Sequence, residues 1–105
     1  MIVRGGFRLR DNQTLTGADA VVGVLQAAGV RCIFSLSGNQ IMPVYNALLD
    51  CGIRLVHVRH EASAVYMAEA WAQLTGEIGV ALVTAGAGFG NSLGALLSAR
   101  ASETP

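Results

Sequence analysis

The chain has 105 residues, of which 52% are hydrophobic and 13% charged, and its formal net charge is zero. This composition excludes a chain that stays disordered for lack of hydrophobic residues. It also argues against a nucleic-acid partner, because arginines cluster only within residues 1–10 and lysine is absent. No apolar run reaches the length of a membrane span, so no membrane partner is expected. Two isolated cysteines form neither a disulfide framework nor a zinc site, and a reducing cytoplasm is the expected location.

The chain divides into a short lead-in and one predicted domain. Residues 1–14 are polar and contain glycine without any hydrophobic period, whereas residues 15–105 alternate between helical and strand-like patterns. The first helix is predicted to begin after Thr16, because Thr16 and Asp19 have the spacing of a capping box. Gly29 is predicted to end that helix.

Three apolar segments are predicted to be strands, and a helix is predicted to follow each of them. The strands are 31–36, 53–58 and 78–84, and the helices are 41–49, 61–74 and 91–101. This alternation predicts the α/β class, with a parallel sheet and crossover helices on both faces. Because the chain ends where a further strand is expected, the domain is predicted to be incomplete.

Ligands of open parallel sheets bind beyond the carboxyl ends of the strands. Three predicted loops lie there, at residues 37–39, 59–61 and 86–91. The third is rich in glycine, which lets the backbone approach a ligand closely. It is not a dinucleotide fingerprint, because Asn91 stands where the third glycine is needed, and without lysine it is not a phosphate-binding P-loop. A tight turn from strand to helix, with no ligand, explains these glycines equally well.

Glu61 is predicted to begin a helix. An acidic side chain there interacts favourably with the helix dipole, and that explanation requires no catalytic role. His57 and His60 have no partners at the spacing of metal ligands, so no metal site is predicted.

Several segments, taken together in their order and spacing, resemble a known family. They are residues 16–20 (TGADA), 29–30 (GV), 34–40 (FSLSGNQ), 59–61 (RHE) and 79–84 (GVALVT), followed by Gly88 and Asn91. This set resembles the N-terminal pyrimidine-binding domain of thiamine-diphosphate-dependent enzymes, and most closely the acetolactate synthase type. The resemblance covers residues 15–105.

The resemblance implies an enzyme that acts on 2-keto acids with thiamine diphosphate as its cofactor. In that family the glutamate of the Arg-His-Glu segment contacts the cofactor's aminopyrimidine and activates it, which makes Glu61 the expected catalytic residue. The resemblance also implies that the cofactor is bound by Glu61, Gly38, Thr84, Gly88 and Asn91.

The family holds the diphosphate and its magnesium ion in a separate Gly-Asp-Gly…Asn module, which has no counterpart in this sequence. No residue of this chain is therefore expected to bind metal, and the chain alone is expected to be inactive. Its implied partner is a diphosphate-binding domain in another subunit of a homo-oligomer, because the family's sites are shared between subunits.

The sequence departs from the family pattern at Ser37 and Ala87, which are usually proline. Thr84 stands where some decarboxylases of the family carry a catalytic histidine. Two alternatives remain open: a nucleotide-binding α/β module that uses residues 86–91, and a non-catalytic interaction domain with the same fold. The first lacks an acidic residue about 20 positions beyond the turn, and the retained glutamate at position 61 disfavours the second.

Overall fold

The computed structural model describes residues 14–105, so the predicted lead-in lies, apart from Thr14, outside the described residues. The helices are α1 (Gly17–Ala27), α2 (Met42–Ala47), α3 (Glu61–Thr75) and α4 (Ala87–Ala101), and the 3-10 turn η1 (Asn39–Ile41) precedes α2. The strands are β1 (Cys32–Ser35), β2 (Arg54–His57) and β3 (Ala81–Leu82). Within residues 14–105, no helix is both long and apolar enough to cross a membrane.

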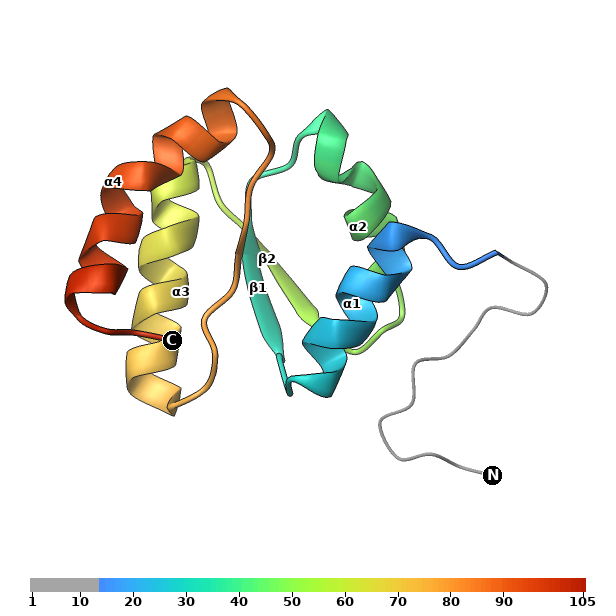
Figure 1. Ribbon diagram of the computed structural model, residues 1–105, viewed down its shortest axis with the longest axis horizontal. Helices are drawn as coiled ribbons and strands as arrows, with labels where there is room; N and C mark the ends of the chain where they lie inside the picture. Colours follow the sequence, from blue (N-terminus) through green and yellow to red (C-terminus); the bar gives the residue numbers. More distant parts are fainter. Residues whose placement is uncertain (1–13) are drawn as a thin grey trace.

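The three strands form one parallel sheet in the order β2-β1-β3, with β1 in the centre. Helices α1 and α2 lie on one face of the sheet and α3 on the other, with α4 packed against α3 on the side away from the strands (Figure 1). This arrangement confirms the predicted α/β class with crossover helices on both faces. Because all strands are parallel, their carboxyl ends meet at a single edge, from which the chain enters η1, α3 and α4.

The central strand supplies the core of both layers, since successive side chains of a strand point to opposite faces. Ile33 is fully buried in a cluster with residues of α1 and of the connecting loops, namely Val22, Val30, Leu48 and Ile53. On the other face, Cys32 and Phe34 pack with Val58, Ala64 and Ala68. Burial raises the pKa of the Cys32 thiol, which agrees with a packing role for this cysteine.

Helix α1 begins and ends where the sequence predicts. The Asp19 backbone N–H donates to Thr16 Oγ1 at 3.2 Å, and the Thr16 backbone N–H donates to Asp19 Oδ2 at 2.9 Å, so the capping box is formed. Gly29 follows the helix with a φ of 79°, a conformation that glycine adopts without a steric penalty.

The third strand is shorter than predicted. Instead of residues 78–84, only Ala81 and Leu82 form β3, which is paired on one side alone. The segment before β3 packs closely against α3. A Cβ atom on Gly79 would overlap the carbonyl oxygen of Ala68. The Gly79 N–H donates to the carbonyl oxygen of Pro105 at 3.0 Å, so its hydrogen bond goes to the C-terminus and not to a strand.

Helix α4 begins at Ala87, four residues earlier than the predicted start at position 91. The prediction of a loop over residues 86–91 is therefore wrong for most of that segment. Gly86 alone makes the turn, with a φ of 70°, and the residues after it continue as helix. Gly88 and Asn91 consequently share one helix, three positions apart, which brings their side of the helix to the same neighbour.

Candidate functional site

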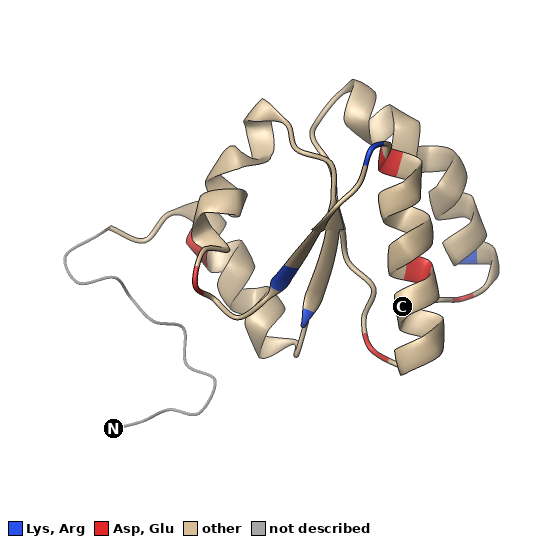
Figure 2. Ribbon diagram, turned by 180° about the vertical axis from the view of Figure 1, so that it is seen from behind, with Lys and Arg blue, Asp and Glu red and all other residues tan. Residues whose placement is uncertain are grey.

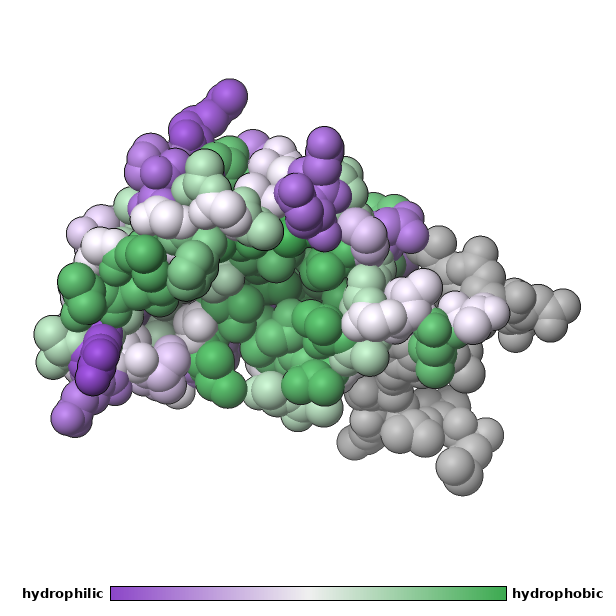
Figure 3. All heavy atoms as spheres, turned by 45° about the horizontal axis from the view of Figure 1, so that its top comes forward, coloured by the Kyte–Doolittle hydropathy of each residue, from purple (hydrophilic) through white to green (hydrophobic). Residues whose placement is uncertain are grey.

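The three segments predicted from the sequence to bind a ligand, residues 37–39, 59–61 and 86–91, lie at the carboxyl-end edge of the sheet. The chain leaves β1, β2 and β3 at this edge, at the top of Figure 1. Viewed with that edge turned forward, apolar residues occupy the middle of the surface and hydrophilic residues lie mostly toward its rim (Figure 3).

Glu61 is the first residue of α3 and is only 9% exposed. The preceding residue, His60, caps the helix, because the Ala62 backbone N–H donates to His60 Nδ1 at 3.1 Å. Position and charge still suit the helix dipole, but the cap itself is made by His60. The burial of Glu61 exceeds what an acid serving only the dipole needs.

Asn91 contacts Glu61 from the neighbouring helix. The Asn91 side-chain Nδ2 donates to Glu61 Oε2 at 3.2 Å, across 30 residues of sequence. Within residues 14–105, no salt bridge reaches this carboxylate. Its partner in the described chain is therefore a neutral amide.

Gly88 allows α4 to approach the site closely. A Cβ atom on Gly88 would lie 2.7 Å from Thr84 Cγ2 and 3.3 Å from Glu61 Oε1. The first distance is far below van der Waals contact, so any larger residue forces Thr84 or the helix to move. Gly88 is thus required where α4, Thr84 and Glu61 meet.

Thr84 connects this group to the loop after β1. A Cβ atom on Gly38 would overlap the Thr84 side chain, and the Thr84 hydroxyl donates to Gln40 Oε1 at 2.6 Å. The five site residues predicted from the sequence therefore form one continuous set of close neighbours: Gly38, Thr84, Gly88, Glu61 and Asn91. Their roles toward a ligand stay predictions.

Three residues with side-chain hydrogen bonds close to this edge were not predicted from the sequence: Gln40, Ser35 and Tyr45. Gln40 is the partner of Thr84. Ser35 is fully buried at the end of β1, donates its hydroxyl to the Leu82 carbonyl at 2.6 Å, and accepts from the Tyr45 hydroxyl at 2.7 Å. The available signal for Ser35 was a hydroxyl within an otherwise apolar strand, because a buried hydroxyl needs a partner.

Comparison with known proteins identifies the family. Residues 15–105 match the family described as "Thiamine pyrophosphate enzyme, N-terminal TPP binding domain". The chain belongs to this family. The family resemblance drawn from the sequence segments is therefore confirmed. Thiamine pyrophosphate, the ligand in the family's description, is also called thiamine diphosphate.

Curated relatives extend far beyond this chain. The catabolic acetolactate synthase of Raoultella terrigena is 43% identical over 95 residues, which are 90% of this chain and 17% of that protein. The human 2-hydroxyacyl-CoA lyase 2 is 46% identical over 89 residues, which are 85% of this chain and 14% of that protein. The probable acetolactate synthase of Mycobacterium bovis is 36% identical over 93 residues, or 89% of this chain and 17% of that protein. The chain thus spans about a sixth of the length of these relatives.

The described residues fit one part of the family's cofactor. A carboxylate among glycines suits a flat nitrogen-containing ring, because glycine permits close approach and the carboxylate offers acceptors for an N–H group. A diphosphate with its metal ion has different needs. Within residues 14–105, no group of three or more His, Cys, Asp or Glu side chains could hold a metal ion.

Proposed function

We propose that residues 15–105 are the pyrimidine-binding domain of a thiamine-diphosphate-dependent enzyme that acts on 2-keto acids, in the manner of an acetolactate synthase. The observation that carries the proposal is the placement of Glu61. Its carboxylate is buried at the carboxyl-end edge, contacts the amide of Asn91, and lies beside Gly88. Membership of the family supplies the cofactor class.

Glu61 acts as the catalytic residue in this proposal. When bound, thiamine diphosphate supplies a carbon nucleophile for the carbonyl group of the substrate. The carboxylate of Glu61 shares a proton with a ring nitrogen of the aminopyrimidine, a task that suits a positioned acid or base in surroundings with little water. Gly38, Thr84 and Gly88 form the wall beside that ring, and Asn91 lies next to Glu61.

Diphosphate and magnesium binding is assigned to a domain outside this chain. A homo-oligomer then completes each site with the diphosphate-binding domain of another subunit, and the chain alone is inactive. A large apolar stripe on α4 gives such a partner a surface to cover; it consists of Phe89, Leu93, Leu96 and Leu97. We also propose a cytoplasmic location, in keeping with two free cysteines.

A second candidate activity is cleavage of a 2-hydroxyacyl-CoA. The observation in its favour is the 46% identity to 2-hydroxyacyl-CoA lyase 2, against 43% to the catabolic acetolactate synthase. Glu61 has the same proposed role in both activities, so only a measurement of which substrate is turned over distinguishes them.

The test uses the full-length protein that contains this chain, supplied with thiamine diphosphate and magnesium. Turnover of pyruvate, a simple 2-keto acid, is measured beside turnover of a 2-hydroxyacyl-CoA. We expect turnover to depend on the cofactor and to fall by roughly 10²- to 10⁴-fold in Glu61→Gln. Glu69→Gln is the matched control. Glu69 lies further along α3, away from the candidate site, and accepts a hydrogen bond from Ser102 at the C-terminal end of α4.

Normal turnover in Glu61→Gln, or turnover without thiamine diphosphate, contradicts the proposal. Activity on the 2-hydroxyacyl-CoA alone replaces the 2-keto acid assignment with the lyase assignment and leaves the role of Glu61 intact.

A further inference from the structure

The two carboxylate oxygens of Glu61 have different surroundings. Oε2 accepts the hydrogen bond from Asn91 Nδ2 at 3.2 Å. Oε1 accepts a hydrogen bond from none of the residues 14–105. Every fully enclosed polar side-chain atom in this part of the chain has a hydrogen-bond partner, so Oε1 is not enclosed and keeps some access to solvent. One oxygen is thus held by the protein, and the other is open to a ligand.

Gly88 keeps the open side of the carboxylate clear. A Cβ atom at position 88 would lie 3.3 Å from Oε1, close enough to crowd any group that approaches this oxygen. Gly88 and Asn91 are three positions apart on α4, so they face the same neighbour. A single helix therefore fixes Oε2 through Asn91 and leaves room at Oε1 through Gly88.

The chemistry of Asn91 suits a residue that orients a carboxylate without neutralising it. A carboxylate offers only acceptors, so the amide must turn its NH₂ group toward Oε2. Hydrogen bonds to charged groups are stronger than neutral ones, which lets a single amide fix the side-chain rotamer. An arginine or lysine at this place would instead form an ion pair and compete for both oxygens.

We propose that Asn91 is a positioning residue that holds Oε2 of Glu61 and leaves Oε1 as the oxygen that exchanges a proton with the bound ring. This differs from the expectation that Asn91 touches the cofactor itself, because Asn91 acts here through Glu61. The inference rests on the proposed function for the identity of the ring, and on the hydrogen bonding of Glu61 for the asymmetry of the carboxylate.

A double-mutant cycle separates positioning from direct contact. In the full-length holoenzyme, hydrogen–deuterium exchange at C2 of bound thiamine diphosphate is followed by NMR in wild type, Asn91→Ala, Glu61→Gln and the double variant. We expect Asn91→Ala to slow exchange by roughly 10- to 100-fold, the factor expected from a lost hydrogen bond to a charged group. In the Glu61→Gln background the same change should slow exchange by less than about twofold, because Asn91 then has no carboxylate to position.

Any other result contradicts either the inference about Asn91 or the proposed function. Fully additive losses overturn the inference and assign Asn91 a direct contact with cofactor or substrate, while the proposed function stands. Unchanged exchange in Asn91→Ala overturns the inference as well. Unchanged exchange in Glu61→Gln overturns the proposed function, and with it the role of Oε1.

A second measurement needs no cofactor. In the full chain, NMR of the Asn91 side-chain amide should show one proton protected from solvent exchange, and that protection should disappear in Glu61→Ala. Asn91→Asp keeps the shape but sets an acceptor against Oε2, so it should slow C2 exchange at least as much as Asn91→Ala. Asn46→Asp, on the exposed side of α2, should leave the rate unchanged. An amide with no protected proton in wild type contradicts the hydrogen bond and overturns the inference.

Discussion

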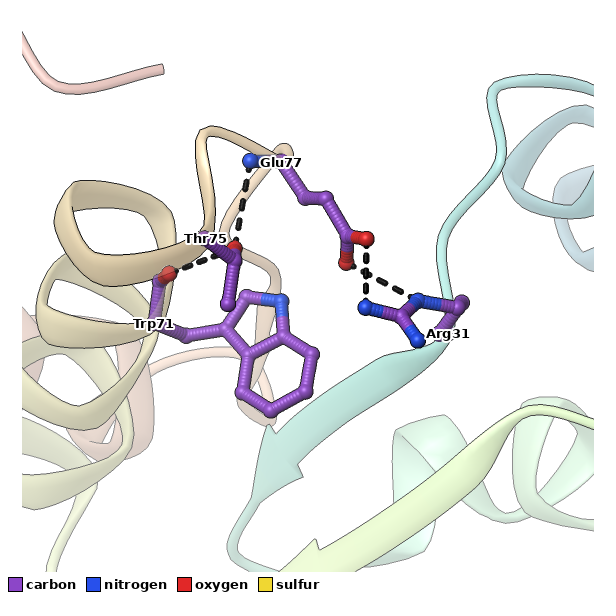
Figure 4. Close-up of polar contacts among 4 residues, drawn as sticks. All are labelled: Arg31, Trp71, Thr75 and Glu77. Carbon is purple, nitrogen blue, oxygen red and sulfur yellow. Dashed lines mark hydrogen bonds and ion pairs between the residues drawn. The ribbon is translucent and has the colours of Figure 1, made fainter.

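Two carboxylates at opposite edges of the sheet are held in opposite ways. At the carboxyl-end edge, Glu61 accepts one hydrogen bond from the neutral amide of Asn91. At the other edge, Glu77 lies beside Arg31 at the start of β1, with Arg31 Nη2 2.5 Å from Glu77 Oε1 and Arg31 Nε donating to Oε2 at 3.1 Å (Figure 4). Both oxygens of Glu77 are therefore engaged, whereas one oxygen of Glu61 is open.

The two carboxylates also differ in their exposure to solvent. The side chains of Arg31 and Glu77 are 66% and 31% exposed, whereas Glu61 is buried, with 9% of the whole residue exposed. The hydrogen bond to Glu77 and the charge of Glu77 both raise the pKa of Arg31. Arg31 also lies over the ring of Trp71 at 5.7 Å, which ties β1 to α3. Charged residues are sparse elsewhere on the ribbon (Figure 2). The Arg31–Glu77 pair therefore connects parts of the fold at one edge, whereas at the other edge one oxygen of Glu61 accepts no hydrogen bond from residues 14–105.

The largest effect on stability is expected from a side chain at position 88, where α4 lies closest to Thr84. Gly88→Ala should lower the free energy of unfolding by about 1–3 kcal/mol, because the new methyl group meets Thr84 Cγ2 at 2.7 Å. Urea denaturation measures the change. Gly90→Ala in the same helix meets no atom within 4 Å and should raise stability by about 0.5–1 kcal/mol. Equal losses in both variants would show that helix geometry, not contact with Thr84, causes the effect.

A smaller effect is expected where hydroxyl groups tie α2 to the sheet near the site. Tyr45→Phe removes the donor to Ser35 Oγ, while Ser35 still donates to the Leu82 carbonyl. The loss should be about 0.5–1.5 kcal/mol, the usual net worth of one hydrogen bond. Tyr66→Phe on the exposed face of α3 is the matched control and should change little. Thermal unfolding of both variants gives the comparison, and an equal shift in the two would refute a special role for the Tyr45 hydroxyl.

The smallest effect is expected at the opposite edge. Glu77→Gln removes the ion pair with Arg31, but surface ion pairs contribute little and are screened by salt. The melting temperature should fall only slightly at low salt, and the difference from wild type should shrink as salt is added. A large loss that persists at high salt would mean that Glu77 contributes through packing and not through charge.

Local patterns in the sequence predicted much of the fold but little of the side-chain pairing. The capping box of Thr16 and Asp19 spans three residues, so it can be read directly and was confirmed. The start of α4 was misplaced because glycines at 86–91 resemble a loop, although Gly86 alone makes the turn. Close packing against α3 shortened β3, and a single sequence does not reveal that contact.

Long-range partners could not be predicted for the same reason. Arg31 and Glu77 are 46 residues apart, and Thr84 and Gln40 are 44 apart, so no spacing rule connects them. The site residues themselves were predicted through the family resemblance and the loop positions, because parallel strands bring their carboxyl ends together. Their contacts with one another came only from the structure.

The most direct test of the account compares the two carboxylates in one assay. Hydrogen–deuterium exchange at C2 of bound thiamine diphosphate is measured by NMR in the full-length protein as wild type, Glu61→Gln and Glu77→Gln. Both changes preserve shape and remove one negative charge, but only Glu61 lies at the candidate site. We expect exchange to be slowed by roughly 10²- to 10⁴-fold in Glu61→Gln and to be unchanged in Glu77→Gln. Equal exchange rates in wild type and Glu61→Gln would contradict it.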